Sequence, residues 1–144
     1  FNSIIITKSE NLYSINKKIW KEEYIVLYIY EYPTCSTCKK AKKLLTTHNI
    51  EATYFNVKEA TPTVETFKKI IETFDLPLKK LFNTSGLVYK ELNLKNKLDT
   101  LSLDEALELL HNNGMLIKRP LAFDFENDIL LLGFKEESWE TALL

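Results

Sequence analysis

The spacing of apolar and polar positions predicts a strand, a helix and a second strand early in the chain. Residues 25–30 form a continuous β-branched and aromatic run, which is typical of a buried strand. Residues 35–48 repeat apolar positions at helical spacing, with lysines on the opposite face. Residues 51–57 alternate polar and apolar side chains, which predicts a second strand. Such a unit pairs two parallel strands through a connecting helix.

The middle of the chain has a mainly helical pattern. Pro62 suits the first turn of a helix that continues to Phe74 and ends at residues 75–77. A short helix is expected over 78–82. The leucine-rich residues 87–101 show no clear period and are not assigned.

The last part of the chain predicts a helix, a hairpin and a final helix. Ser102 and Glu105 form a capping box, so a helix is predicted over 103–112, and Gly114 is expected to stop it. The pattern that follows predicts two strands joined by a tight turn and then a helix, over 120–125, 128–132 and 136–144.

Residues 1–24 differ from the rest of the chain. They contain a short β-branched run over 4–7 and then mixed charges, without a sustained period. We expect them to form a loosely ordered N-terminal extension ahead of one domain that covers 25–144.

Composition narrows the class of protein. The chain has 144 residues, of which 45% are hydrophobic, which is enough for one domain with its own core. The formal net charge of -1 gives no electrostatic basis for binding nucleic acid directly. No apolar run approaches the ~20 residues of a membrane helix. The two cysteines stand in one CxxC, which is not the pattern of a secreted disulfide framework, so we expect a cytoplasmic protein.

Cys35 and Cys38 form this CxxC where the first predicted strand ends and the helix begins. The first sulfur of such a motif lies at the helix N-terminus, where unpaired N–H groups and the helix dipole stabilise a thiolate. The second cysteine lies one turn inside the helix and can attack a mixed disulfide on the first. We therefore predict that Cys35 is a nucleophile with a lowered pKa and that Cys38 is the resolving thiol.

Other interpretations of the pair stay open at this point. The cysteines could be one half of a metal site or two unpaired buried thiols. A zinc site would normally need two more Cys or His ligands at motif spacing, but His48 and His111 stand alone, so no metal site is expected. Lys39 and Lys40 add positive charge beside the motif, although a run of charges is usually a solvated face.

Arg119 and Pro120 form a second candidate. Proline at the start of a strand removes a ladder donor, which makes sense if its peptide bond is cis and holds backbone beside a reactive site. Arg119 is the sole arginine in a chain that otherwise uses lysine, which suggests a need for a planar, always-charged fork that binds an anion. The alternative is a surface arginine without a role.

The CxxC after the first strand, the helix pair and the late segment 117–121 with its hairpin together resemble the ArsC/Spx family, from about residue 25 to the C-terminus. The resemblance implies an α/β, thioredoxin-like fold, in which a mixed sheet is flanked by helices and a helical region is inserted at about 62–113. It also implies a cis proline at Pro120.

The members of that family differ in the chemistry of their sites. Its glutathione-dependent arsenate reductases carry the cysteine that matches Cys35, usually lack one at Cys38, and hold the oxyanion with three arginines. Here only Arg119 has a match, because the other two positions fall within 81–84 and 132–134, where this chain has no arginine. The Spx-like regulators carry the CxxC as an oxidation switch, and the resemblance to them implies binding to the RNA polymerase α subunit.

Three functions therefore remain. The first is a thiol–disulfide oxidoreductase that uses Cys35 and Cys38, with a disulfide substrate and with thioredoxin or a low-molecular-weight thiol as external reductant. The second is a redox-sensing regulator that binds RNA polymerase. The third is an arsenate reductase with an atypical oxyanion site. Enzymatic function is favoured, and no bound cofactor is expected, because the chain has neither a Walker A motif nor a GxGxxG motif.

Overall fold

The computed structural model describes residues 25–144 and contains a four-stranded sheet in the order β2-β1-β3-β4. The strands are β1 (Leu27–Glu31), β2 (Ala52–Asn56), β3 (Leu121–Asp124) and β4 (Ile129–Leu132). β1 is parallel to β2 and antiparallel to β3, and β3 is antiparallel to β4. The sheet is therefore mixed, and the predicted parallel strand–helix–strand unit is confirmed.

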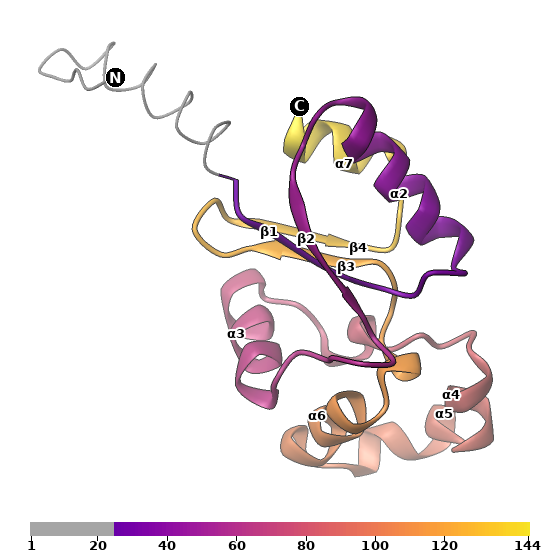
Figure 1. The fold of residues 1–144 in the computed structure, drawn as a ribbon. Coiled ribbons are helices and arrows are strands. Elements are labelled where there is room, and N and C mark those ends of the chain that lie inside the picture. Colours follow the sequence, from indigo (N-terminus) through magenta and orange to yellow (C-terminus); the bar gives the residue numbers. More distant parts are fainter. Residues whose placement is uncertain (1–24) are drawn as a thin grey trace, which may run out of the picture.

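Helices cover both faces of this sheet (Figure 1). α2 (Ser36–Thr47) and α7 (Glu136–Leu143) lie on one face. The other face is covered by the segment between β2 and β3, which forms α3 (Val64–Phe74), η1 (Leu78–Leu81), α4 (Leu87–Glu91), α5 (Leu94–Lys97), η2 (Leu98–Thr100), α6 (Leu103–Asn112) and η3 (Gly114–Leu116), where η marks a 3-10 helix. This arrangement confirms the thioredoxin-like fold class.

The alternation of side chains along β1 separates two cores. Leu27 and Ile29 face α2 and α7, where they pack with Leu45 and Trp139. The indole N–H of Trp139 donates to the carbonyl of Gly133 over 2.9 Å, so the buried ring keeps a polar partner. A strand that buries alternate residues against a helix pair in this way orients the start of α2 firmly.

The opposite face of β1 is aromatic. The ring of Tyr30 stacks on Phe55 of β2, with centroids 4.7 Å apart, and on Phe123 of β3, with centroids 6.0 Å apart. The rings of Tyr30 and Phe123 belong to the core that also holds the buried Phe67 of α3 and the leucines of α6. Aromatic pairs across neighbouring strands stabilise the sheet at its centre.

Two helix starts show how local capping works here. The capping box at α6 is present as predicted, because Glu105 N–H donates to Ser102 Oγ over 3.1 Å and Ser102 N–H donates to Glu105 Oε1 over 2.9 Å. α3 begins later than the sequence predicts. The hydroxyl of Thr63 accepts the N–H of Thr66 over 3.1 Å, so the helix begins after Thr63, and Pro62 precedes it.

Residues 87–101, which the sequence pattern leaves unassigned, form three short helices. Tyr89, Leu94 and Leu98 are buried in the same core as α3 and α6. Segments this short gain little from helix propensity, so their conformation depends on that packing.

Gly114 does not end α6 as predicted, because the helix already ends at Asn112 and Gly114 begins η3. Its φ is not in the left-handed region, and Asn113 is the helix cap. A Cβ on Gly114 would overlap the carbonyl oxygen of Val57, so the position needs glycine because two backbones meet there.

The turn between β3 and β4 is tied to the start of β1 by Asp124, whose side chain is 2% exposed. Its carboxylate accepts the N–H of Val26 over 2.8 Å, and it accepts both the backbone and the side-chain N–H of Asn127. A buried carboxylate with three donors is well satisfied, and it holds the predicted hairpin turn in place.

The prediction of a loosely ordered extension over 1–24 lies outside the described residues. Within residues 25–144, none of the helices combines the length and the apolar character that crossing a bilayer requires.

Gly114→Ala should lower the free energy of unfolding by about 3 kcal/mol, because the new methyl group meets backbone atoms of Val57 that can move only with the chain. Urea unfolding followed by circular dichroism measures this change. Gly86→Ala is the matched control, since its methyl group would first meet the side-chain amide of Asn83, which can rotate away. Equal losses in the two variants would contradict the close-approach explanation.

Candidate functional site

The sheet register brings the candidate residues to one end of the sheet. Tyr30 of β1 pairs with Leu121 of β3, and Leu121 pairs with Leu132 of β4. The turn that leaves β1 for Cys35, the segment that enters β3 through Arg119, and the turn after β4 therefore share this end (Figure 1). The structure thus brings together the two motifs that the sequence singles out.

Cys35 is the N-cap of α2, with φ -73° and ψ 121°. Its Sγ accepts the backbone N–H of Cys38 over 3.3 Å, and its own N–H donates to the carbonyl of Tyr32 over 3.0 Å. The helix starts here because a side-chain acceptor satisfies one of the N–H groups that the first turn leaves unpaired. The sulfur is half-buried, and both cysteines are free thiols.

The surroundings of Cys35 favour its thiolate. Partial burial raises the pKa of this thiol, but hydrogen bonds from Cys38 and Thr37 and the charge of Arg119 outweigh burial, so its pKa lies below the ordinary value. The hydroxyl of Thr37 lies 3.0 Å from the sulfur and donates to it when the sulfur is charged. The position of Cys35 at a helix N-terminus acts in the same direction.

Cys38 has the opposite environment. It is 2% exposed, on the face of α2 that carries Ala41 and Leu45. Burial raises the pKa of the Cys38 thiol to about 12, and the hydrogen bond to Cys35, the charge of Cys35 and the charge of Glu31 add to this effect. The two thiols therefore differ: that of Cys35 ionises readily, and that of Cys38 keeps its proton.

Arg119 uses one arm of its guanidinium within its own segment, and anion binding by this residue stays a prediction. Its Nη1 donates to the carbonyls of Met115 and Ile117, over 3.0 and 3.1 Å. Its Nε is enclosed and has no hydrogen-bond partner in the described structure. The guanidinium carbon lies 6.0 Å from the ring centroid of Tyr32, and the peptide bond to Pro120 is cis. Arg119 thus contributes charge beside Cys35 and holds the turn before β3.

Three residues at the site were missed by sequence reasoning. Thr37 could have been found, because a hydroxyl between the two cysteines of a helix-starting motif can reach the first sulfur. Glu31 ends β1, and burial raises the pKa of its carboxyl group, which Lys42 partly offsets. Tyr32 faces Arg119 only because of the turn geometry, for which the sequence offers no signal.

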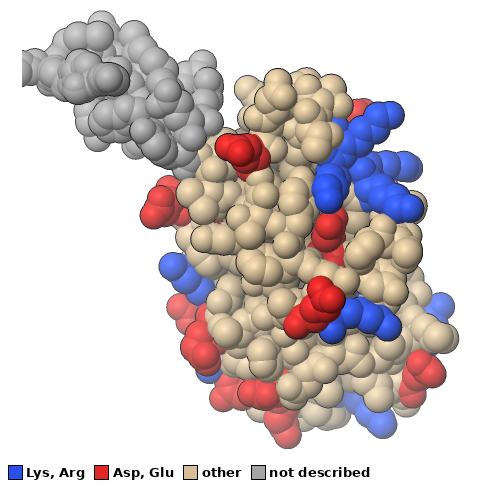
Figure 2. Space-filling view, viewed as in Figure 1, with Lys and Arg blue, Asp and Glu red and all other residues tan. Residues whose placement is uncertain are grey.

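The lysines of α2 form a solvated face. Lys39, Lys40, Lys42 and Lys43 are exposed, and basic side chains gather over α2 in the upper right of Figure 2. Lys42 lies over the ring of Tyr54, with its Nζ 4.4 Å from the centroid. These residues support the helix and the neighbouring strand rather than converge on the sulfur.

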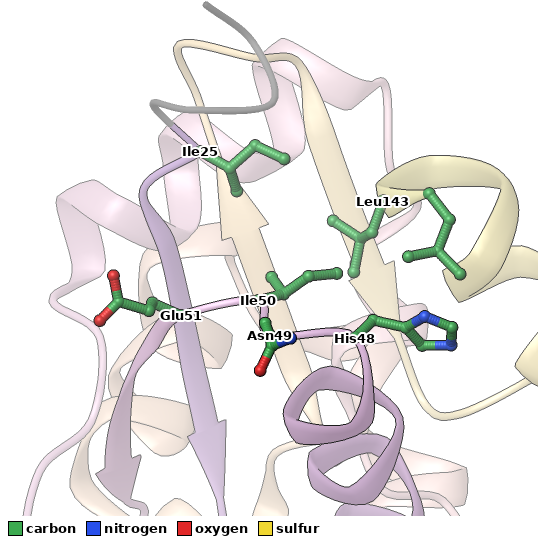
Figure 3. A pocket seen from close by; sticks show the side chains of 7 residues that line it. Ile25, His48, Asn49, Ile50, Glu51 and Leu143 are labelled. Atoms are coloured by element: carbon green, nitrogen blue, oxygen red, sulfur yellow. The ribbon is translucent and has the colours of Figure 1, made fainter. Parts of the chain in front are cut away.

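A hollow at the other end of α2 lies away from this chemistry. Figure 3 shows it between the helix end at His48, the following residues Asn49 to Glu51, and Leu143 of α7. Its two titratable groups, His48 and Glu51, are exposed. In the described part of the chain, no three His, Cys, Asp or Glu residues are grouped as metal ligands would be.

The fold and the position of the two cysteines define a thioredoxin-like protein with its CxxC at a helix N-terminus. The family model for the ArsC family matches residues 30–142, so the chain belongs to the ArsC family.

Relatives of known sequence include three bacterial proteins. The chain is 51% identical to the uncharacterized protein YusI of Bacillus subtilis over 114 residues, which cover 79% of this chain and 95% of YusI. It is 32% identical to the regulatory protein MgsR of the same organism, over 75% of this chain and 82% of MgsR. It is 30% identical to the global transcriptional regulator Spx of Enterococcus faecalis, over 78% of this chain and 82% of Spx.

Solved structures show the same fold. A protein of Bacteroides fragilis described as ArsC family related is 48% identical, with a TM-score of 0.73 over 81% of this chain and 96% of the other. A Streptococcus mutans protein described as a "possible arsenate reductase" is 40% identical, with a TM-score of 0.72 over 81% of this chain and 98% of the other.

Iodoacetamide at pH 7 should alkylate Cys35 well before Cys38, because the pKa of Cys35 is lowered and that of Cys38 is raised to about 12. Peptide mass spectrometry over time measures both rates. Thr37→Val should slow alkylation of Cys35 several-fold at this pH, since the thiolate loses a donor, whereas Thr37→Ser should keep the rate. Equal rates at the two cysteines would contradict the division of the pair.

Proposed function

We propose that this protein is a thiol–disulfide oxidoreductase in which Cys35 attacks a substrate disulfide and Cys38 resolves the product. The observation that carries the proposal is the contrast between the two sulfurs. Cys35 caps α2 and has a lowered pKa, while Cys38, one turn away, is buried and protonated. Unequal thiols at this spacing suit a two-step exchange.

The first step forms one bond and breaks one. The Cys35 thiolate attacks a sulfur of the substrate disulfide, which produces a mixed disulfide and releases the other half of the substrate as a thiolate. Because Cys35 is only half-buried, a substrate disulfide can approach its sulfur. The hydrogen bonds from Cys38 N–H and Thr37 position the same sulfur.

The second step needs Cys38 to lose its proton. In the free protein, burial is the main reason for its high pKa, and the hydrogen bond to Cys35 and the charge of Cys35 contribute further. Once Cys35 is in a mixed disulfide, its sulfur is neutral, so these two contributions disappear. Cys38 can then ionise more easily and attack the Cys35 sulfur, which releases the second substrate thiol and leaves a Cys35–Cys38 disulfide. An external thiol reductant supplies the two electrons that restore the pair, as expected in a cytoplasmic setting.

Cys38→Ser should trap a mixed disulfide on Cys35, because no second thiol remains to release it. Intact-protein mass spectrometry after incubation with hydroxyethyl disulfide measures the adduct. Cys35→Ser is the matched control and should form little adduct, since Cys38 is buried and protonated. In the wild type, a Cys35–Cys38 couple on the order of -200 to -300 mV is expected from redox titration. The absence of an intramolecular disulfide throughout this range would contradict the proposal.

A redox-sensing regulator is the second candidate. The observation that favours it is the similarity to MgsR and Spx, which are named as regulators. The resemblance to this group implies binding to the RNA polymerase α subunit, with the CxxC as a switch.

This candidate predicts that oxidation of Cys35 and Cys38 changes RNA polymerase binding at least several-fold. The measurement is capture of the polymerase α subunit, as its purified C-terminal domain, on the immobilised protein. Cys38→Ser, which cannot form the intramolecular disulfide, should show no such change. Capture of nothing in either redox state would exclude the regulator function and leave the oxidoreductase proposal intact.

Arsenate reduction has weaker support. The sole arginine of the chain already donates to the carbonyls of Met115 and Ile117 through Nη1. An oxyanion site that relies on several bidentate forks cannot be assembled around it.

A further inference from the structure

A basic cleft lies at the same end of the molecule as the cysteines. It has a volume of about 650 Å³, and its lining includes apolar side chains, among them Phe82 and Leu132. Four of its nine lining residues are lysines, and none is acidic; the lysines are Lys79, Lys80, Lys118 and Lys135. They come from three separate segments, η1, the residues before β3 and the start of α7. The fold therefore gathers charges that the sequence keeps apart.

These charges have no carboxylate partners within the described residues, where the structure contains one ion pair, Lys68 with Asp104. The whole chain has a formal net charge of -1, so the cleft is a local concentration of positive charge and not part of a generally basic surface. A recess lined by one sign of charge raises the local concentration of oppositely charged small molecules.

The walls of the cleft are held in place by backbone contacts. The N–H of Lys118 donates to the carbonyl of Leu81 over 2.8 Å, and Phe82 bridges to Ile117. The side chain of Lys118 lies against the turn after β4, since a Cβ on Gly133 would be 3.2 Å from its Cε and 3.9 Å from its Nζ. Gly133, with φ 73°, leaves room for this contact beside the segment that carries Lys135.

The cleft and the redox pair are linked through the segment that enters β3. Lys118 precedes Arg119, whose charge lowers the pKa of Cys35, and Gly133 N–H donates to the carbonyl of Pro120 over 2.9 Å. The enclosed Nε of Arg119 is an unused donor on the same segment. The segment 118–120 thus contributes Lys118 to the cleft and, through Arg119, a charge that acts on Cys35.

We propose that this cleft binds the anionic groups of a small organic disulfide or thiol whose sulfur reacts at Cys35. The inference rests on the thiol–disulfide exchange proposed above. Lysine ammonium groups act as point charges, so they bind carboxylates or phosphates without a fixed geometry, and the apolar lining residues accommodate carbon atoms. The volume lies in the range of small-ligand sites. In the reaction, the Cys35 thiolate forms a bond to one substrate sulfur, and the other leaves as a thiolate.

Stopped-flow rates with two disulfides test this proposal. The probes are the dianionic 5,5′-dithiobis(2-nitrobenzoate) and the neutral 4,4′-dithiodipyridine, and the measured quantity is the ratio of their second-order rate constants. Lys118→Gln with Lys135→Gln should lower the ratio about tenfold, as expected when a focused charge is removed. Lys90→Gln with Lys95→Gln removes the same charge from exposed positions on α4 and α5 and should leave the ratio unchanged. An equal fall in both double variants, or no fall in either, would overturn the cleft as the binding site.

Further experiments distinguish failure of the proposed exchange function from failure of the cleft as a binding site. If neither probe reacts at Cys35 in the wild type, the proposed exchange function fails rather than the cleft. The cleft is then tested without chemistry, by titrating Cys35→Ser with 2-nitro-5-thiobenzoate and following backbone amide signals by NMR. Saturable shifts at Lys118 and Gly133 support binding, and their absence overturns it. Succinate and inorganic phosphate as competitors, at constant ionic strength, show whether carboxylate or phosphate is the recognised group.

Discussion

The hydrogen bond from Cys38 N–H to the sulfur of Cys35 is the interaction on which the site depends. The first N–H groups of a helix lack partners, and an oxygen side chain usually accepts one of them. Here a sulfur does so, and a thiolate is the stronger acceptor because it is charged. The bond that starts α2 therefore also favours the charged nucleophile. Since neutral sulfur accepts weakly, helix capping and the redox state of Cys35 are coupled.

The difference between the two thiols follows from their places in this helix. Cys35 is at the cap, where the chain has just left the sheet, so its sulfur stays partly open. Cys38 is one turn further and shares the apolar face with Ala41 and Leu45, so packing α2 on the sheet must bury it. The positions of the two cysteines in α2 are therefore enough to make their pKa values differ. The sheet register then adds Arg119 from a distant part of the chain.

The sequence predicted what depends on neighbours in the chain. β1, α2 and β2 have clear periods, α6 has its capping box, and Cys35 and Cys38 belong to one local motif. The sequence could not predict the features that depend on contacts between residues far apart in the chain. The short helices of 87–101 are held by the core, and Gly114 is needed because it meets Val57. At Arg119 the sequence shows the residue type but not where its donors point: Nη1 donates to carbonyls two and four residues away, and anion binding by the rest of the guanidinium stays a prediction.

The same limit on Arg119 bears on which anions the site can recognise. A compact oxyanion is best held by planar forks at fixed angles, and the arginine beside Cys35 has committed one arm to Met115 and Ile117. The basic groups of the cleft are lysines, and each can turn to meet a charge from many directions. Such a set recognises charge on a flexible carbon framework better than it recognises tetrahedral geometry. A thiol with charged substituents on a flexible carbon framework is the kind of ligand that such a set would recognise.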